Sequence, residues 1–298
     1  MAYLYTAKNM SDMYITLASE VMFGKTVGNT KERNNVVFEI EDPTDCIALP
    51  RGMSYSYMLG ELVWYLCARN DVDFIKTFGP YWEKISDDGV TSNSAYGYIV
   101  FKKHGFDQYR QVVDQLRKDP NSRRAKINIS VPNANSIDTK DEPCTIALDF
   151  MIRDGRLHCT AVMRSSDIWL GIPYDVVFFT TLQRMIADEL GIAVGTYTHF
   201  SASLHAYEKD FPKILAMLKE YGGLPTNTMV APRLSVYWLN HYLKPLESMI
   251  IKHRNKPGFK KAFVKEAYRL KIIQKGEEQD EDLDNSLWTA TSSEKSSL

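Results

Sequence analysis

The stretch RSSDIWLGIPYDVV, from Arg164 to Val177, places groups that could bind an anion directly before a carboxylate. An arginine and two serines precede a helix that Pro173 opens, and Asp175 falls in the first turn of that helix. Guanidinium groups and helix starts both favour phosphate, so the loop predicts an anion site. Asp175 alone has a simpler explanation, because the first turn of any helix favours a carboxylate.

Two further residues are of types that carry chemistry. Cys144 follows Pro143 at the start of a strand pattern, where a cysteine is either a nucleophile or a small apolar core residue. Glu61 is the one acid in the apolar stretch SYSYMLGELVWYLCAR. It is interpreted either as a proton-transfer group or as an ion-paired core acid. The six histidines and four cysteines lack metal-site spacing, so no metal site is predicted.

The elements that must position these residues mix helices and strands. The apolar spacing predicts strands at VVFEI and in a hairpin that the turn RDG joins, with Cys144, Ile146, Leu148 and Phe150 on one face. The segment GKTVGNTKERNN is interpreted as a polar loop. Helices are predicted at 10–24, 54–69, around YRQVVDQLRKDP, at 174–190, near 210–222 and at 236–253.

The chain of 298 residues is 44% hydrophobic with a formal net charge of -1, which is typical of a globular protein with a large core. It shows no signal-peptide pattern and no apolar run of the ~20 residues that cross a bilayer. We therefore expect a cytoplasmic protein, with neither membrane nor nucleic acid as a partner. The pattern predicts one α+β domain at 1–275 and a mobile acidic, Ser-rich tail at 276–298.

Seven motifs in order resemble the thymidylate synthase family. They are GELVWYL (60–66), SAYGY (94–98), SRR (122–124), PC (143–144), RSSD (164–167), GIPYD (171–175) and HAY (205–207). The resemblance runs from about Ser54 to Asp210 and continues more weakly toward the N-terminus. It implies a thymidylate synthase-like fold, in which a mixed sheet is flanked by helices and two chains form a sheet-to-sheet homodimer.

The resemblance also implies a folate-dependent one-carbon transferase with assigned residues. Cys144 would add to C6 of a pyrimidine, as a thiolate that a nearby arginine helps to maintain, while Glu61 and Tyr96 organise proton transfers. The 5′-phosphate would be bound by Arg33, Arg164 and Ser165, together with Arg123 and Arg124 from the partner chain. His205 and Tyr207 would hold the sugar 3′-hydroxyl. The cosubstrate 5,10-methylenetetrahydrofolate would contact Trp82, Asp167, Gly171 and Tyr174.

Three departures from the family pattern bear on substrate and product. Asp175 stands where the synthases have asparagine, and a carboxylate accepts from the amino group of cytosine but opposes O4 of uracil. Thr145 stands where a histidine usually follows the nucleophile, and the C-terminus does not resemble the synthase ending. A site more open to water would let water add to the methylene at C5, which gives a hydroxymethyl group.

The resulting prediction is a deoxycytidylate (dCMP) 5-hydroxymethyltransferase, a branch known from bacteriophage DNA modification, which would act in the host cytoplasm. The alternatives are a reductive dCMP methylase, a dUMP methylase or hydroxymethylase, and a CMP hydroxymethylase. An alternative from another class is an inactive homologue that binds nucleic acid through the basic stretch 252–271. A solvated helix face is the simpler interpretation of that stretch.

Overall fold

The computed structural model describes residues 3–130, 138–224 and 230–275, and its centre is one mixed sheet. The strand order is β1-β3-β8-β6-β5-β4, with β2 paired to β3 and β7 to β8. β1 and β3 are parallel, as are β6 and β8, whereas β3–β8 and β5–β6 are antiparallel. The strands are β1 (Tyr3–Ala7), β2 (Lys25–Val27), β3 (Thr30–Ile40), β4 (Lys126–Asn128), β5 (Thr145–Arg153), β6 (Arg156–Met163), β7 (Ser166–Asp167) and β8 (Ala193–Tyr207).

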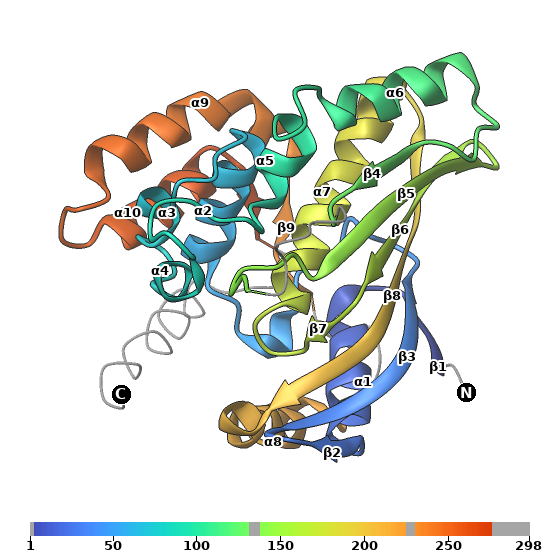
Figure 1. Cartoon of the computed structure of the whole chain (residues 1–298), viewed down its shortest axis with the longest axis vertical. Coiled ribbons are helices and arrows are strands. Elements are labelled where there is room, and N and C mark those ends of the chain that lie inside the picture. Colours follow the sequence, from blue (N-terminus) through green and yellow to red (C-terminus); the bar gives the residue numbers. More distant parts are fainter. Residues whose placement is uncertain (1–2, 131–137, 225–229, 276–298) are drawn as a thin grey trace.

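The described helices gather on one side of this sheet (Figure 1). They are α1 (Met10–Met22), α2 (Tyr55–Leu66), α3 (Val72–Ile75), α4 (Tyr81–Ile85), α5 (Tyr96–Phe101), α6 (Gln108–Lys118), α7 (Ile172–Leu190), α8 (Phe211–Tyr221), α9 (Val236–His253) and α10 (Phe259–Arg269). A small second sheet pairs β9 (Arg233–Leu234) with β10 (Ile273–Gln274). The predicted α+β class, with a mixed sheet flanked by helices, is confirmed.

The helices that carry Glu61 and Asp175 begin and end where their sequences indicate. Ser54 caps α2 by accepting the backbone N–H of Tyr57, and α2 then buries nearly every side chain up to Tyr65. α7 has Pro173 in its first turn and ends at Gly191, whose φ of 67° is the left-handed conformation that glycine adopts readily. Burial of both apolar helices therefore fixes where Glu61 and Asp175 lie.

The predicted loop at 24–35 is wrong, because most of it forms a hairpin. β2 and β3 pair antiparallel around a turn in which Gly28 has a φ of 56°. From Thr30 onward, β3 also pairs with β8, the long strand beside it. That pairing satisfies the backbone of a polar stretch, so tertiary contacts override its composition.

The predicted one-sided face of the Cys144 strand is also wrong, because β5 carries a bulge. The pairing with β6 shifts between Thr145 and Ala147, and the carbonyl of Ile146 accepts the backbone N–H of both Ile129 and Ser130. Leu148 and Phe150 point into the core as expected, but Ile146 is 41% exposed. One extra residue in a strand reverses which side chains face inward, so Thr145 takes the inward position.

Several predictions concern the ends of the chain and its cysteines. The tail predicted at 276–298 lies outside the described residues, and the domain boundary at 275 stays a prediction. Cys46, Cys67, Cys144 and Cys159 are all free thiols. No helix in the described part of the chain is both long and apolar enough to cross a bilayer.

Candidate active site

The predicted nucleophile lies at the entrance to β5, where the phosphate-loop arginine holds the backbone. Arg164 donates from Nε to the carbonyl of Pro143 at 3.1 Å and from Nη2 to that of Glu142 at 2.9 Å. Its own backbone N–H donates to the carbonyl of Cys144 at 2.9 Å. Ser165 Oγ lies 3.5 Å from Cys144 Sγ. The structure thus brings Cys144, Arg164 and Ser165 together, as predicted.

The resting form of Cys144 differs from the expectation. Burial is the main cause that raises the pKa of this thiol above its usual value, and the carboxyls of Asp175 and Asp167 raise it further. The hydrogen bond from Ser165 and the charge of Arg164 act in the opposite direction, but they are outweighed. The arginine therefore favours the thiolate, but it does not outweigh the effect of burial on the pKa of Cys144.

The predicted sugar-binding residues lie on the adjoining strand. His205 and Tyr207 are two residues apart on β8, so both point to the same face, and their rings meet edge to face at 5.2 Å. Asp167 stands beside His205 in the β7–β8 pairing. The pKa of Tyr207 is raised, first by burial and then by Asp167 and Cys144. Asp167 and Tyr207 are therefore close enough to Cys144 to interact electrostatically with it, and His205 lies beside both.

A second group of site residues lies on α2. Glu61 is only 7% exposed, and its carboxyl accepts hydrogen bonds from Tyr57 at 2.7 Å and from Tyr65 at 3.5 Å. Trp82 Nε1 in turn donates to Tyr57 Oη at 2.9 Å. Burial raises the pKa of Glu61 to about 7, although both tyrosines oppose the shift. A carboxyl with this pKa can take up and release protons near neutral pH.

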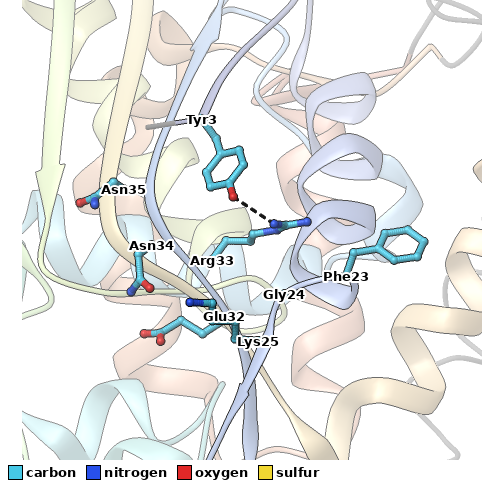
Figure 2. Close-up of a pocket in the computed structure, with 8 residues that line it drawn as sticks. All are labelled: Tyr3, Phe23, Gly24, Lys25, Glu32, Arg33, Asn34 and Asn35. Carbon is cyan, nitrogen blue, oxygen red and sulfur yellow. Dashed lines mark hydrogen bonds between the residues drawn. The ribbon is translucent and has the colours of Figure 1, made fainter. Parts of the chain in front are cut away.

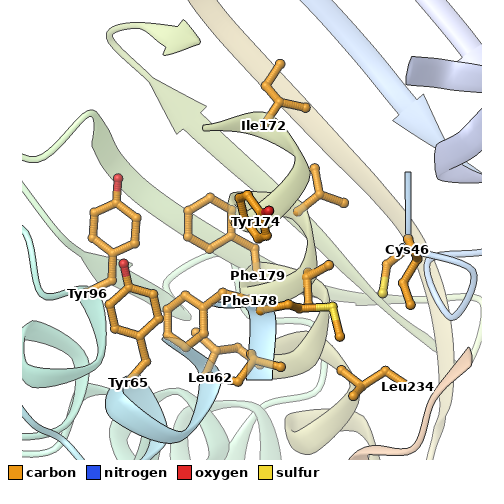
Figure 3. Packing of buried hydrophobic residues seen from close by; sticks show 14 of the residues in the cluster. Cys46, Leu62, Tyr65, Tyr96, Ile172, Tyr174, Phe178, Phe179 and Leu234 are labelled. Carbon is orange, nitrogen blue, oxygen red and sulfur yellow. The ribbon is translucent and has the colours of Figure 1, made fainter. Parts of the chain in front are cut away.

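Tyr96, which is buried, and Asp175, which is half-buried, complete this group. Burial raises the pKa of Asp175 well above its usual value, and Glu61 and Asp167 add to the effect. The pKa of Tyr96 is likewise raised, mainly by burial and then by Asp175 and Cys144. The Tyr96 ring stacks on Tyr65 at 5.6 Å, within the packed aromatic residues around α7 (Figure 3). The sequence-predicted catalytic residues therefore share one site.

The residues predicted for the folate cosubstrate form two pairs of neighbours. Tyr174 and Trp82 both contact Tyr57, the first edge to face at 4.7 Å and the second by its hydrogen bond. Gly171 lies close to Asp167, because a Cβ at Gly171 would lie 3.1 Å from the carbonyl oxygen of Asp167 and 3.3 Å from Asp175 Oδ2. Aromatic surfaces beside a carboxylate fit a pterin, which stacks and offers N–H donors.

Arg33 is not placed where the phosphate prediction requires it. It pairs with Leu204 across β3 and β8, whereas the adjacent residue, Glu32, pairs with His205, so Arg33 and His205 point to opposite faces. Its guanidinium donates to the carbonyl of Glu20 at 3.0 Å and to Tyr3 Oη at 3.2 Å, beside a pocket of about 360 Å³ (Figure 2). The strand alternation that turns a polar loop into β3 causes this difference.

Arg123 and Arg124 also lie away from their own chain's nucleophile. They are exposed, and they precede β4, in which Lys126 pairs with Asp149. Arg124 is thus level with the far part of β5, roughly 20 Å from Cys144 at ~3.3 Å per strand residue. One chain therefore does not bring these arginines to its own Cys144.

Two hydrogen-bond networks beside the site were not predicted. Asp141 is buried and accepts from Ser92 Oγ and from the backbone N–H of Asn93, both at 2.7 Å, and from Ser94 Oγ. It thereby ties the segment before Cys144 to the loop before Tyr96. The pair Ser92 and Ser94, of which Ser94 opens SAYGY, was the only sequence signal for it.

The second network connects Ser166, in the segment that follows Arg164, to two side chains of β8. Ser166 Oγ lies 3.1 Å from His199 Nε2, and Tyr197 Oη lies 2.8 Å from the other ring nitrogen. Burial lowers the pKa of His199 to about 3, so the imidazole is neutral.

No group of three or more potential metal ligands occurs within residues 3–130, 138–224 and 230–275.

Known proteins that are similar in sequence to this chain include two phage hydroxymethyltransferases and a thymidylate synthase. The deoxyuridylate hydroxymethyltransferase of Bacillus phage SP01 is 29% identical over 254 residues, covering 77% of this chain and 66% of that protein. The same-named protein of Pseudomonas phage M6 is 32% identical over 196 residues, covering 61% and 56%. Thymidylate synthase of Symbiobacterium thermophilum is 30% identical over 193 residues, covering 57% and 66%. The chain thus spans just under two thirds, or less, of the length of these relatives.

A match to a family model agrees with these relatives and covers more than half of the chain. The sequence model of the thymidylate synthase family matches residues 30–237, a range that holds Cys144, Glu61, Asp175 and Arg164. Members of this family use methylenetetrahydrofolate as a cosubstrate. The chain belongs to the thymidylate synthase family.

Proposed function

We propose that this protein transfers a one-carbon unit from 5,10-methylenetetrahydrofolate to C5 of dCMP and hydrates it to a hydroxymethyl group. The observation that carries the proposal is Asp175, a half-buried carboxyl that interacts electrostatically with Tyr96, Glu61 and Cys144 at the position where the synthases have an amide. Such a position is the one that reads the N3–C4 edge of the base. The chemistry of that edge decides between cytosine and uracil.

The two forms of Asp175 pair differently with the two bases. A neutral carboxyl has one donor and one acceptor, so it can donate to N3 of cytosine while accepting from the amino group. The same neutral form can also accept from N3–H of uracil and donate to O4. Ionised Asp175 pairs only with cytosine that carries a proton on N3, because its second oxygen would oppose O4 of uracil. The preference for cytosine therefore rests on the ionised pair.

The remaining site residues take roles that match their surroundings. Arg164 and Ser165 bind the 5′-phosphate, and His205 and Tyr207 hold the sugar hydroxyl. Cys144 attacks C6, which makes C5 nucleophilic toward the one-carbon unit. Glu61, with its pKa of about 7, and Tyr96 move the proton that leaves C5. Each role uses a side chain that adjoins Cys144 or Asp175.

Arg123 and Arg124 would act in the site of a partner chain, which requires a dimer. They are exposed and lie roughly 20 Å along the sheet from their own Cys144. The described helices gather on one side of the sheet, which leaves its other side without helices (Figure 1), and Ile146 of β5 is 41% exposed. Two chains packed through this side, related by a two-fold axis, would exchange their arginines. We propose such a homodimer, acting in the cytoplasm.

A second candidate is hydroxymethylation of dUMP. The two phage relatives are named deoxyuridylate hydroxymethyltransferases, and the raised pKa of Asp175 favours the neutral form that can accept uracil. Mass spectrometry of products from dCMP, dUMP and CMP with methylenetetrahydrofolate separates the candidates. The proposal expects a gain of one formaldehyde unit on dCMP in preference to dUMP. A gain of CH₂ with formation of dihydrofolate would indicate a reductive methylase. A preference for dUMP would overturn the proposal that dCMP is the substrate.

A further inference from the structure

The bulge in β5 places an unpartnered hydroxyl directly behind the nucleophile. Thr145 has no exposed surface, and its Oγ1 makes no hydrogen bond with any of the described residues. In a regular strand this side chain would point the other way, since Leu148 and Phe150 occupy the inward positions of the strand. Bulges beside active sites commonly redirect a side chain in this manner.

The surroundings of Thr145 are those of the reaction centre. Its chain neighbour is Cys144, and its hydroxyl interacts with the phenol of Tyr96, whose pKa it lowers against the effects of burial, Asp175 and Cys144, although the two groups do not meet in a direct hydrogen bond of normal geometry. Tyr96 is itself fixed by rings on both sides, with Tyr65 at 5.6 Å and Phe179 at 5.8 Å. Two hydroxyls, from Thr145 and Tyr96, therefore face the same small region beside the nucleophile.

A buried hydroxyl without a hydrogen-bond partner is energetically unfavourable. Folded proteins usually satisfy such groups with an ordered water that bonds to two to four polar atoms. The position also suits the chemistry, because the exocyclic carbon on C5 is one ring atom away from the carbon that Cys144 bonds. A water beside Cys144 is therefore close to that carbon.

We propose that Thr145, with Tyr96, holds the water that adds to the exocyclic methylene, so that Thr145 is a positioning residue that sets the hydroxymethyl product. The inference rests on the proposed hydroxymethyl transfer and names the device that carries out its last step. The water oxygen forms a bond to the methylene carbon, and the C=C electron pair moves toward C4. That pair then forms C5=C6 and expels the Cys144 thiolate, while the water loses one proton to Tyr96 and its neighbours. No oxidant or reductant is required.

The test measures how the intermediate divides between water and an added thiol. Wild type, Thr145→Val and Thr145→Ser are compared with C5-tritiated dCMP, methylenetetrahydrofolate and 2-mercaptoethanol. Tritium release reports formation of the methylene, and mass spectrometry distinguishes the hydroxymethyl product from the thioether. Valine keeps the shape of threonine without its hydroxyl, whereas serine keeps the hydroxyl.

We expect Thr145→Val to release tritium at a rate near that of wild type but to lose roughly tenfold or more of its hydroxymethyl product, the scale of one buried hydrogen bond. The thioether should rise in its place, and Thr145→Ser should restore the wild-type division. An unchanged division in Thr145→Val, or an equal fall in tritium release and product, would overturn the inference. If Thr145→Val does not fold, the ratio of hydroxymethyl product to thioether is measured for Thr145→Ala instead. Wild type that forms no hydroxymethyl product would instead refute the proposed function.

Discussion

The two halves of the site differ in how their reactive groups are held. On the strand side, Cys144 and Arg164 are fixed by backbone carbonyls, and Arg164 remains exposed to solvent. On the helix side, Glu61 and Asp175 are set among aromatic rings, and burial raises the pKa of both. One half therefore holds a fixed cation, whereas burial in the other half raises the pKa of the carboxyls, so that Glu61 can exchange a proton near pH 7.

The largest effect on turnover is expected from a substitution in the strand half of the site. Cys144→Ser should abolish turnover, because a serine hydroxyl is far less nucleophilic than a thiol, while the folded protein still binds dCMP. Product assays and nucleotide binding by calorimetry measure the two properties. Cys67→Ser, at the C-terminal end of α2, is the matched control and should turn over normally. Near-normal product from Cys144→Ser would rule out the covalent step.

A change on the helix half should be smaller but still large. Glu61→Gln removes a proton-transfer group and should lower kcat by roughly 10²–10⁴-fold with nucleotide binding retained. In wild type, the pH profile of kcat/KM should bend near pH 7, where Glu61 titrates, and this bend should vanish in the variant. Glu220→Gln, on the exposed face of α8, is the control. A bend that persists in Glu61→Gln would assign it to another group.

The proposed dimer predicts recovery of activity on mixing two inactive proteins. In a mixed dimer of Arg124→Ala and Cys144→Ser, one site regains both Cys144 and Arg124. Free exchange should then give roughly a quarter of wild-type activity. Subunit exchange is verified by mass spectrometry of the intact dimer. Exchange without recovered activity would contradict a shared site.

The smallest expected effect is on stability. The folded protein keeps Asp175 protonated above the pH at which the unfolded chain ionises it, so the free energy of unfolding falls as pH rises between the two pKa values. An asparagine side chain cannot ionise, so Asp175→Asn should raise Tm by a few degrees at pH 8, at about 2–4 °C per kcal/mol, and by less at pH 4. A purely helix-capping role predicts a lower Tm instead.

The sequence predicted the helix half of the site better than the strand half. Glu61, Tyr57 and Tyr65 are spaced four residues apart, so a helix must align them, and the spacing alone could have identified both tyrosines. The basic stretch after α9 likewise fits a solvated face, because α10 buries Phe259 and Phe263 and exposes its lysines.

Strand positions were harder to predict because a shift of one residue reverses the face. Arg33 points away from the site since its apparent loop is a strand. Thr145 points inward since β5 bulges before Ala147. Neither the pairing nor the bulge leaves a local sequence signal, because both depend on a partner strand distant in the chain.

The most direct test of the account is the base preference of Asp175→Asn. The change leaves the phosphate and sugar contacts in place and supplies the amide donor that O4 of uracil requires. We predict that the ratio of kcat/KM for dCMP to that for dUMP falls by roughly ten- to a hundredfold, the scale of one mispaired buried contact. An unchanged ratio, in a variant that remains folded and active, would contradict the claim that Asp175 selects cytosine.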